Sequence, residues 1–544
     1  MYEYLETLIA LMSAEDHAVG SIPYATRLSF EDEPIEPNSS LVVSALRAWN
    51  ERWERADDEF VATLLQRLRQ VIDDVPIHDS AHRWATILSG FCQWAQRRCA
   101  PTEFSELPPQ LLLASRQLYG ELGSAHPCRY LLLAALAHLG QAPALQLLCE
   151  LLVEDPPRNH EAPPIVLSPL FRRNDSQWLP HVFPRLLDAI CHTDWASAVL
   201  DLANFAARRH AISDHPARAR RDELAKLLEA ITSQLERAGK SATTAESLEL
   251  YRRQVVEGSA MAVSLCDALG LMGDPASSSE LLHCMELPHR RLAVEAAAAL
   301  ARLGNEAGTS RLIELAAEPS ARLRVLAYGE ELGIEEQIDE VYRCAVSIAE
   351  AELVTYLADP SQFGIPPNRC ELLDSRTLYW PGYEEPRNCY LFRFRYLYQL
   401  PDGKEAEYEN IGIAGPLAHA FKADMCQLNI DDVYAAFAGW QAEHDEIREL
   451  RWTDMDRDQL RHADRVLAQL SEDGYEHWQS QSVGLFFGTL VFVGRANRDG
   501  QDGVVVVDDR DTMWFPQSGS PRDIGPAEGY CVYKGQRMLA EFNG

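Results

Sequence analysis

The sequence lacks the short motifs by which many enzymes can be recognised. It contains no G-x-x-x-x-G-K-[ST] phosphate loop, no G-x-G-x-x-G after an expected strand, and no G-x-S-x-G nucleophile turn. Catalytic residues scattered along a chain would leave no such trace, so these absences do not exclude every enzyme. We therefore assign no catalytic residue, cofactor or metal, and we favour a protein that is not an enzyme.

Closely spaced cysteine pairs are also missing. The chain has 12 cysteines but no C-x-x-C pair. Several lie in apolar helical contexts, among them Cys149, Cys266 and Cys284. Buried free thiols in a reducing compartment explain this distribution better than disulfides or zinc sites.

Long apolar runs and a secretory leader are absent as well. No stretch approaches the roughly 20 apolar residues that a membrane span requires. The amino-terminal sequence MYEYLETLIALMSAEDH begins with acidic residues and has only a short apolar run, unlike a signal peptide. We expect a cytoplasmic protein without a membrane partner.

Positive charge is scarce. Lys and Arg number 50 against 82 Asp and Glu, which gives a formal net charge of -32. Affinity for nucleic acid comes largely from cations that neutralise phosphates, and anionic lipid attracts basic surfaces. The balance argues against nucleic acid and favours a protein partner, preferably a basic one.

What the sequence does contain is enough apolar material for several cores and a clear helical pattern. Hydrophobic residues make up 47% of the 544 residues, and this length suggests about three structural units. Apolar residues recur at helical spacing over 60–72, and further helices are expected at 81–98, 108–121 and 127–139.

A repeated segment stands out within this helical region. LLLAALAHLG (131–140), LCDALGLMGD (265–274), AAAALARLGN (296–305) and LAYGEELGIE (326–335) each read as an Ala/Leu helix ending in a Leu-Gly or Met-Gly step. The glycines Gly273, Gly304 and Gly333 recur at the period of a two-helix unit, which is typical of a solenoid. Glycine suits these positions because it adopts the left-handed conformation that ends many helices.

These segments resemble HEAT repeats, especially the short variety named after phycobilisome lyases. The resemblance covers about 260–340 and implies an α-solenoid of helical hairpins, expected here to extend over 60–343. It further implies a superhelix that binds proteins; a minority of such repeats serve in bilin attachment.

We expect three further regions around this solenoid. A helical lead-in occupies 1–59, an α+β region 344–473, and a small β-rich module, either a sheet or a barrel, 474–544. In the α+β region, 388–400 alternates as a strand, with 405–415 as its hairpin partner through an Asp402-Gly403 turn. The aromatic face of that strand carries Tyr390, Phe392, Phe394, Tyr396 and Tyr398.

The remaining expected elements are helices followed by strands. Helices are expected at 416–427, 431–449 and 455–471, with Asp431 as the N-cap of the second. Strands are expected at 483–494, 503–508, 511–515, 529–534 and 536–542.

The clearest candidate for a partner-binding site is the aromatic loop Trp380-Pro381-Gly382-Tyr383 with the arginines Arg393 and Arg395 on the polar face of the strand. Large aromatic side chains make good binding anchors. The alternatives are that the aromatic face is core packed against the helices that follow it, or that it lines a ligand pocket with Arg393 or His419.

Four other constellations have simpler explanations. The first is an acidic helix face at Glu443–Glu446 and Glu449, which lacks the second histidine of a zinc helix. Residues 497–503 are expected to form a hairpin turn rather than a calcium loop. His419 and Cys426, seven residues apart on an expected helix, are interpreted as packing residues, and Asp508, Asp509 and Asp511 as a turn.

Overall fold

The computed structural model describes residues 56–70, 72, 77–98, 106–159, 161–209, 214–241, 245–399 and 404–543. The chain divides into two compact units, Met1–Arg311 and Leu312–Gly544, which are described separately here. Of the expected lead-in at 1–59, all but the last few residues lie outside the described ranges, as does the expected Asp402-Gly403 turn.

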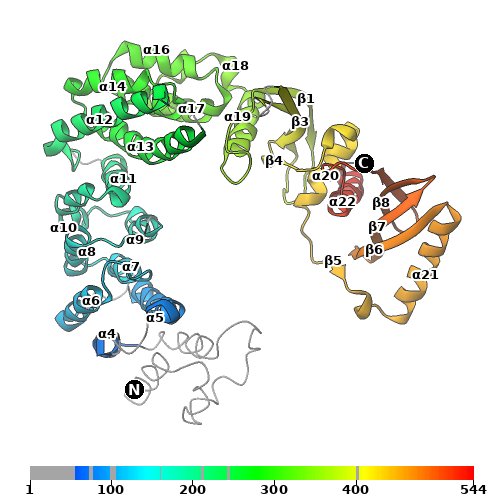
Figure 1. Ribbon diagram of the computed structural model, residues 1–544, viewed down its shortest axis with the longest axis horizontal. Helices are drawn as coiled ribbons and strands as arrows, with labels where there is room; N and C mark the ends of the chain where they lie inside the picture. Colours follow the sequence, from blue (N-terminus) through cyan, green and yellow to red (C-terminus); the bar gives the residue numbers. More distant parts are fainter. Residues whose placement is uncertain are drawn as a thin grey trace, which may run out of the picture. The chain divides into compact units, whose positions relative to one another are not determined.

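The first unit is helical throughout its described part (Figure 1). Its longer helices are α4 (Asp58–Gln70), α5 (Ile77–Arg98), α6 (Pro109–Leu122), α7 (Tyr130–Leu139), α8 (Ala142–Glu154), α9 (Ala162–Phe171), α11 (Thr193–Arg209), α12 (Arg221–Ser241), α13 (Ala245–Met272), α14 (Ser278–Met285) and α15 (Arg290–Arg302). Short helical turns α10 (Leu179–Val182), η3 (Arg185–Cys191), η4 (Arg218–Arg220) and η5 (Pro275–Ser277) connect them, and the unit boundary falls within α16 (Glu306–Leu315).

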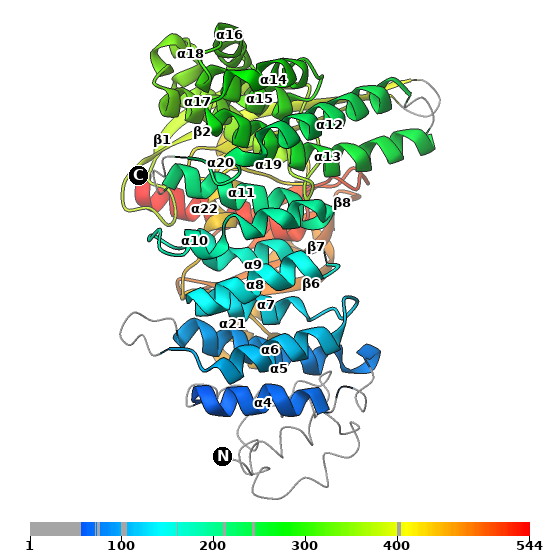
Figure 2. The same ribbon diagram turned by 90° about the vertical axis from the view of Figure 1, so that its left-hand side faces the viewer.

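Helices of this unit pack mainly against the next-but-one helix along the chain. α4 packs on α6, α5 on α7, α7 on α9, α9 on α11, α11 on α13, and α13 on α15. Figure 2 shows α4 to α9 lying one above another in chain order. One continuous apolar core runs between these helices, because each contributes a stripe of residues at helical spacing. The helices expected from the sequence at 60–72, 81–98, 108–121 and 127–139 are therefore confirmed.

The glycines of the repeated segments end helices as expected. Gly140, Gly273, Gly304 and Gly333 follow the ends of α7, α13, α15 and α17 (Pro319–Leu332), with φ angles between 66° and 78°. Pro319 occupies the first position of α17, where its missing N–H costs nothing.

The second unit is built from two antiparallel sheets. The first has the order β1 (Arg369–Leu378), β2 (Arg387–Gln399), β3 (Glu405–Ala414), β4 (His419–Ala420). The second has the order β5 (Ile447–Leu450), β6 (Tyr475–Phe486), β7 (Thr489–Arg498), β8 (Gln501–Val507), β9 (Thr512–Pro516). Its helical elements are α17, η6 (Glu335–Gln337), α18 (Glu340–Arg343), α19 (Ala345–Ala358), η7 (Met425–Gln427), α20 (Ile430–Gln441), η8 (Trp452–Asp454), α21 (Arg457–Glu472) and α22 (Pro526–Asn543).

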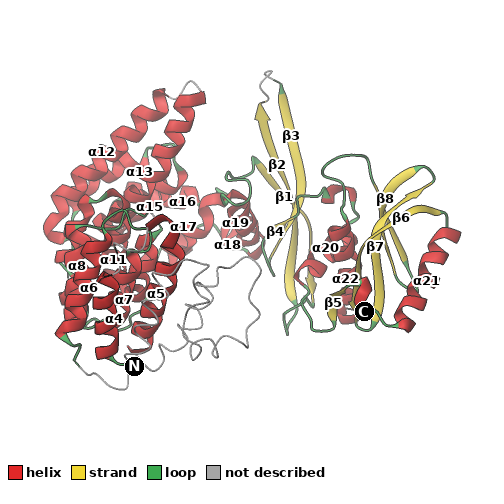
Figure 3. Cartoon of the chain, turned by 60° about the horizontal axis from the view of Figure 1, so that its bottom comes forward, coloured by secondary structure: helices red, strands yellow, loops and turns green. Residues whose placement is uncertain are grey.

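These elements form five layers (Figure 3). α19 covers one face of the first sheet, and α21 covers the outer face of the second. Between the two sheets lie α20 and α22, which share one core with the inner faces of both. The sequence alternates accordingly: Leu391 points into the shared core, whereas Phe392 points toward α19.

Several expected elements of this unit are wrong. Residues 416–427 form the short strand β4 and the turn η7 rather than a helix, and the helix expected at 431–449 ends at Gln441, so that Ile447–Leu450 becomes strand β5. Its N-cap is Asn429, not Asp431. The expected strand 483–494 is a hairpin of β6 and β7, and the expected strands 529–534 and 536–542 are one helix, α22.

The two C-terminal regions that the sequence suggested share structure. β5 from the first pairs with β6 from the second, and α20 packs on α22. They therefore belong to one α+β unit, in which the described strands form two open sheets rather than a barrel. No helix in the described ranges is both long and apolar enough to span a membrane.

Candidate functional site

The loop that contains Trp380 and Tyr383 is bonded into the core of the second unit. Trp380 is only 2% exposed, and its indole N–H donates to the side-chain oxygen of Gln441 at 2.7 Å. The Tyr383 hydroxyl donates to the carbonyl of Pro416 at 2.7 Å, and Arg387 lies over its ring. Trp380 therefore offers a partner almost no surface, contrary to its assignment as an anchor.

The aromatic face of β2 is largely core. Tyr390, Phe392, Phe394 and Tyr396 are buried against α19, while Tyr398 is 49% exposed. The covering helix precedes the strand in the chain, rather than following it as expected. Since these four rings are packed side chains, they do not line a ligand pocket.

Arg393 and Arg395 lie together on the opposite face of β2, beyond the apolar part of that face. Both guanidinium groups approach Glu409 on β3, at 3.5 Å and 2.6 Å, and Arg395 also lies 3.5 Å from Glu407. About a third of each arginine side chain is exposed. These two candidate binding residues thus belong to a set of compensated ion pairs, which gives a partner directional hydrogen bonds but little net charge.

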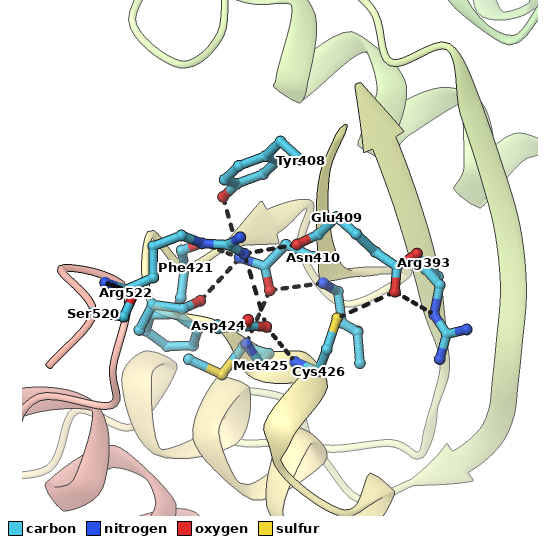
Figure 4. A network of polar contacts seen from close by, with 12 residues as sticks. Arg393, Tyr408, Glu409, Asn410, Phe421, Asp424, Met425, Cys426, Ser520 and Arg522 are labelled. Carbon is cyan, nitrogen blue, oxygen red and sulfur yellow. Dashed lines mark hydrogen bonds and ion pairs between the residues drawn. The ribbon is translucent and has the colours of Figure 1, made fainter. Parts of the chain in front are cut away.

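A buried polar network adjoins these pairs in the middle of β3, and Figure 4 shows its side chains. Its centre is Asn410, which is fully buried. The amide nitrogen of Asn410 donates to the carbonyls of Phe421 and Ala423, and its oxygen accepts the N–H groups of Ile411 and Met425. One side chain therefore fixes the path of residues 421–425 against the sheet.

Arg522 closes the same network from a distant part of the chain. Its guanidinium lies over the ring of Tyr408 and donates to the carbonyl of Glu409 at 2.6 Å (Figure 4). The backbone N–H of Asp424 donates to the carbonyl of Arg522 at 2.7 Å. Sequence reasoning missed Asn410 and Arg522, because neither stands in a motif and their partners lie far away in the chain. These contacts hold the fold together and contain no group poised for chemistry.

His419 and Cys426 do not share a helix face. His419 lies in β4, where its ring stacks on Trp440 at 3.9 Å and its Nδ1 is 3.1 Å from the Tyr356 hydroxyl. Burial lowers the pKa of His419 to about 4, while burial and the nearby carboxylates of Asp424 and Glu409 raise the pKa of Cys426 to about 11. Both groups are neutral at pH 7, so neither is activated for nucleophilic catalysis.

The other constellations set aside from the sequence also have structural explanations. Residues 443–446 form the connection between α20 and β5 rather than a helix face, and within the described ranges no three His, Cys, Asp or Glu side chains are grouped to hold a metal ion. Asp499 and Gly500 make the expected two-residue turn between β7 and β8. Asp508 accepts N–H bonds from Arg510 and Asp511 in the expected turn, and it also binds the Tyr533 hydroxyl on α22.

One exposed thiol has an altered acidity. Cys344 is the N-cap residue of α19, and its interactions with the Ser347 side chain and with the backbone N–H groups of Ser347 and Val346 lower the pKa of its thiol. We expect iodoacetamide at pH 7 to alkylate Cys344 faster than the exposed Cys191, because the thiolate is the reacting species. The lead of Cys344 should shrink toward pH 9, because a thiol whose pKa is already lowered gains little further thiolate there.

Peptide mass spectrometry over a time course of alkylation checks this expectation. Cys149 serves as an internal control, since burial raises its pKa to about 12 and it should remain unlabelled in the native protein. Equal rates for Cys344 and Cys191 at pH 7 would show that the interactions at the start of α19 do not make Cys344 more reactive.

Comparison with known proteins adds no relative. No protein-family model matches the sequence, and a search of curated proteins finds no match. The functional argument therefore rests on the residues and their geometry.

Proposed function

We propose that this protein is a non-catalytic scaffold whose helical unit is a HEAT-type α-solenoid that binds another protein. The observation that carries the proposal is the packing of a helix on the next-but-one helix, which recurs along the unit from α4 to α15. Solenoids of this kind present extended surfaces, and each repeat needs only its neighbours for stability.

Arginine contacts between successive helix pairs support the same proposal. The Arg173 guanidinium donates to the carbonyl of Gly140, just past the end of α7, at 2.8 Å. Arg220 donates in the same way to the carbonyl of Leu187 in η3, at 3.1 Å. Such bonds satisfy backbone carbonyls that helix ends leave free. They also join the chain after α9 to the end of α7, and η4 to η3.

The partner that fits best is a basic protein. The segment from the end of α17 to the start of α18 exposes six carboxylates, those of Glu330, Glu331, Glu335, Glu336, Asp339 and Glu340. Val341, which follows directly, is 54% exposed. Acidic side chains beside an exposed apolar one give a complementary surface for a basic segment with an apolar anchor.

Capture of partners from native lysate with the full-length protein tests the proposal. We expect the variant Glu330→Gln/Glu331→Gln/Glu335→Gln/Glu336→Gln to lose a basic partner that the wild type retains, and the retention to fall with added salt. The control Glu443→Gln/Asp445→Asn/Glu446→Gln/Glu449→Gln makes the same change of charge at another exposed stretch. The proposal fails if no protein is retained, or if both variants retain it equally.

A further inference from the structure

The second sheet carries a polar groove on its inner face. The groove has a volume of about 570 Å³ and is lined mainly by His477, Gln479, Arg495, Asn497, Asp502 and Gln517. All of these residues belong to the second unit, and none of them lies in the acidic segment from Glu330 to Val341 that is proposed above to bind a partner.

The groove arises because the inner face of the sheet changes from apolar to polar along its strands. On β7, Val491 and Val493 belong to the core shared with α20 and α22, whereas Arg495 and Asn497 continue the same face. On β8, Asp502 likewise lies on the same face as Val504, nearer to the start of the strand. α22 packs over the apolar rows and leaves the polar rows to the groove.

The wall of the groove is fixed before any ligand arrives. The loop after β9 is held by Asp523, whose carboxylate accepts the backbone N–H groups of Ser518, Gly519 and Ser520. Hydrogen bonds from Ser518 and these N–H groups also lower the pKa of Asp523, which keeps the carboxylate ionised. A pocket that is already formed needs little ordering when a ligand binds.

His477 has an unusual backbone conformation beside this groove. Three non-glycine residues in the described ranges have positive φ angles: His477, Phe487 and Asp499. Phe487 and Asp499 each precede a glycine in a two-residue hairpin turn. His477 instead lies in an irregular stretch of β6 between Glu476 and Gln479, with a φ of 56°. Bulges and strained residues of this kind concentrate at functional sites.

Arg495 is the cation of the groove. Its guanidinium donates to the side-chain oxygen of Gln517 at 2.9 Å, which is a neutral acceptor. Other arginines of this unit, such as Arg376, Arg395 and Arg537, pair with carboxylates. Asp502, the acid among the residues that line the groove, accepts a hydrogen bond from Asn497 instead. Arg495 thus keeps donors for an anionic group, and the fork of a guanidinium suits a phosphate or carboxylate.

We propose that this groove binds a small hydroxylated anion, with the phosphate or carboxylate on Arg495 and His477. The amides of Gln479, Asn497 and Gln517 and the carboxylate of Asp502 meet the hydroxyl groups of the ligand. An imidazole offers an N–H donor in either protonation state, so His477 serves as a second donor to the anion.

Isothermal titration of the full chain with glycerol 3-phosphate, glycerate and uncharged glycerol tests this site. We expect heat with at least one anion and none with glycerol; the two anions distinguish a phosphate site from a carboxylate site. Arg495→Gln should weaken binding by about tenfold or more. Arg510→Gln, which removes an exposed arginine outside the groove, should leave the affinity unchanged.

A second variant separates the ligand role of His477 from a purely structural one. Glycine accepts a positive φ, so His477→Gly should keep or raise the melting temperature while it weakens binding. The proposal is overturned if neither anion gives heat at about 10 mM, or if Arg495→Gln or His477→Gly binds as tightly as the wild type.

Discussion

Replacing Gly535 with alanine is expected to disrupt the C-terminal unit. α20 and α22 approach each other so closely that a Cβ at position 535 would overlap the carbonyl oxygen of Ala435 and lie 2.7 Å from its Cα. The obstacle is helix backbone, which cannot rotate away as a side chain does. Overpacking of a core commonly costs about 1–3 kcal/mol; we expect a loss at or above the top of that range.

Urea unfolding followed by circular dichroism, with hydrogen exchange of the α20 and α22 amides, measures this loss. Gly439→Ala should behave similarly, because its Cβ would fall 2.8 Å from the carbonyl carbon of Cys531. Gly120→Ala is the matched control: it is also a helical glycine, but no atom would lie within 4 Å of its Cβ, and alanine there should stabilise by about 0.5–1 kcal/mol. If Gly535→Ala is as stable as the control, the two helices are not in the contact described.

The same glycine explains why the sequence misled us about α22. Tyr530, Val532 and Tyr533 are residues typical of strands. Gly535 stands between the expected strands 529–534 and 536–542, where it was interpreted as a break. In the structure Gly535 lies where α22 closely approaches the backbone of α20 at Ala435. Its cost to the helix is offset by packing that only the folded unit provides, so local propensity could not predict the element.

The helical unit was predictable because its signals are local. The glycines at 273 and 304 and the apolar spacing between them lie within single turns or hairpins. Long helices with a strong period are the elements that sequence patterns identify best.

The candidate site was much less predictable. Arg522 and Glu409 are 113 residues apart, and neither the residue spacing nor the composition of the sequence indicates the hydrogen bond between them. The prediction that Arg393 and Arg395 share a face was correct, but the strand pattern did not predict that both arginines would pair with Glu409. Trp380 looked like an exposed anchor because it stands in a turn, yet Gln441 and the core cover it. Burial of a turn residue depends on elements that are distant in the sequence.

Removal of the Arg322 guanidinium should be the second large loss. This side chain is 3% exposed and joins α17 to its neighbours in the second unit. Its Nε donates to the carbonyl of Ala316 at 2.9 Å, and Nη1 donates to the carbonyl of Ser347 and to Glu350, both at 2.7 Å. Breaking a buried pair from one side typically costs about 3–5 kcal/mol, since the remaining groups are left desolvated and unpaired.

Arg322→Met keeps most of the apolar volume, so its effect reports the lost bonds rather than a cavity. We expect a decrease of about 3–5 kcal/mol in the free energy of unfolding, measured by urea titration of the full chain. Glu350→Gln should cost less, because Arg322 retains its carbonyl acceptors. Arg369→Met removes an exposed arginine of the same unit, whose side chain is 63% exposed and pairs with Glu371, and it should cost at most about 1 kcal/mol. Equal losses for Arg322→Met and Arg369→Met would show that the buried guanidinium does not hold α17 and α19 together.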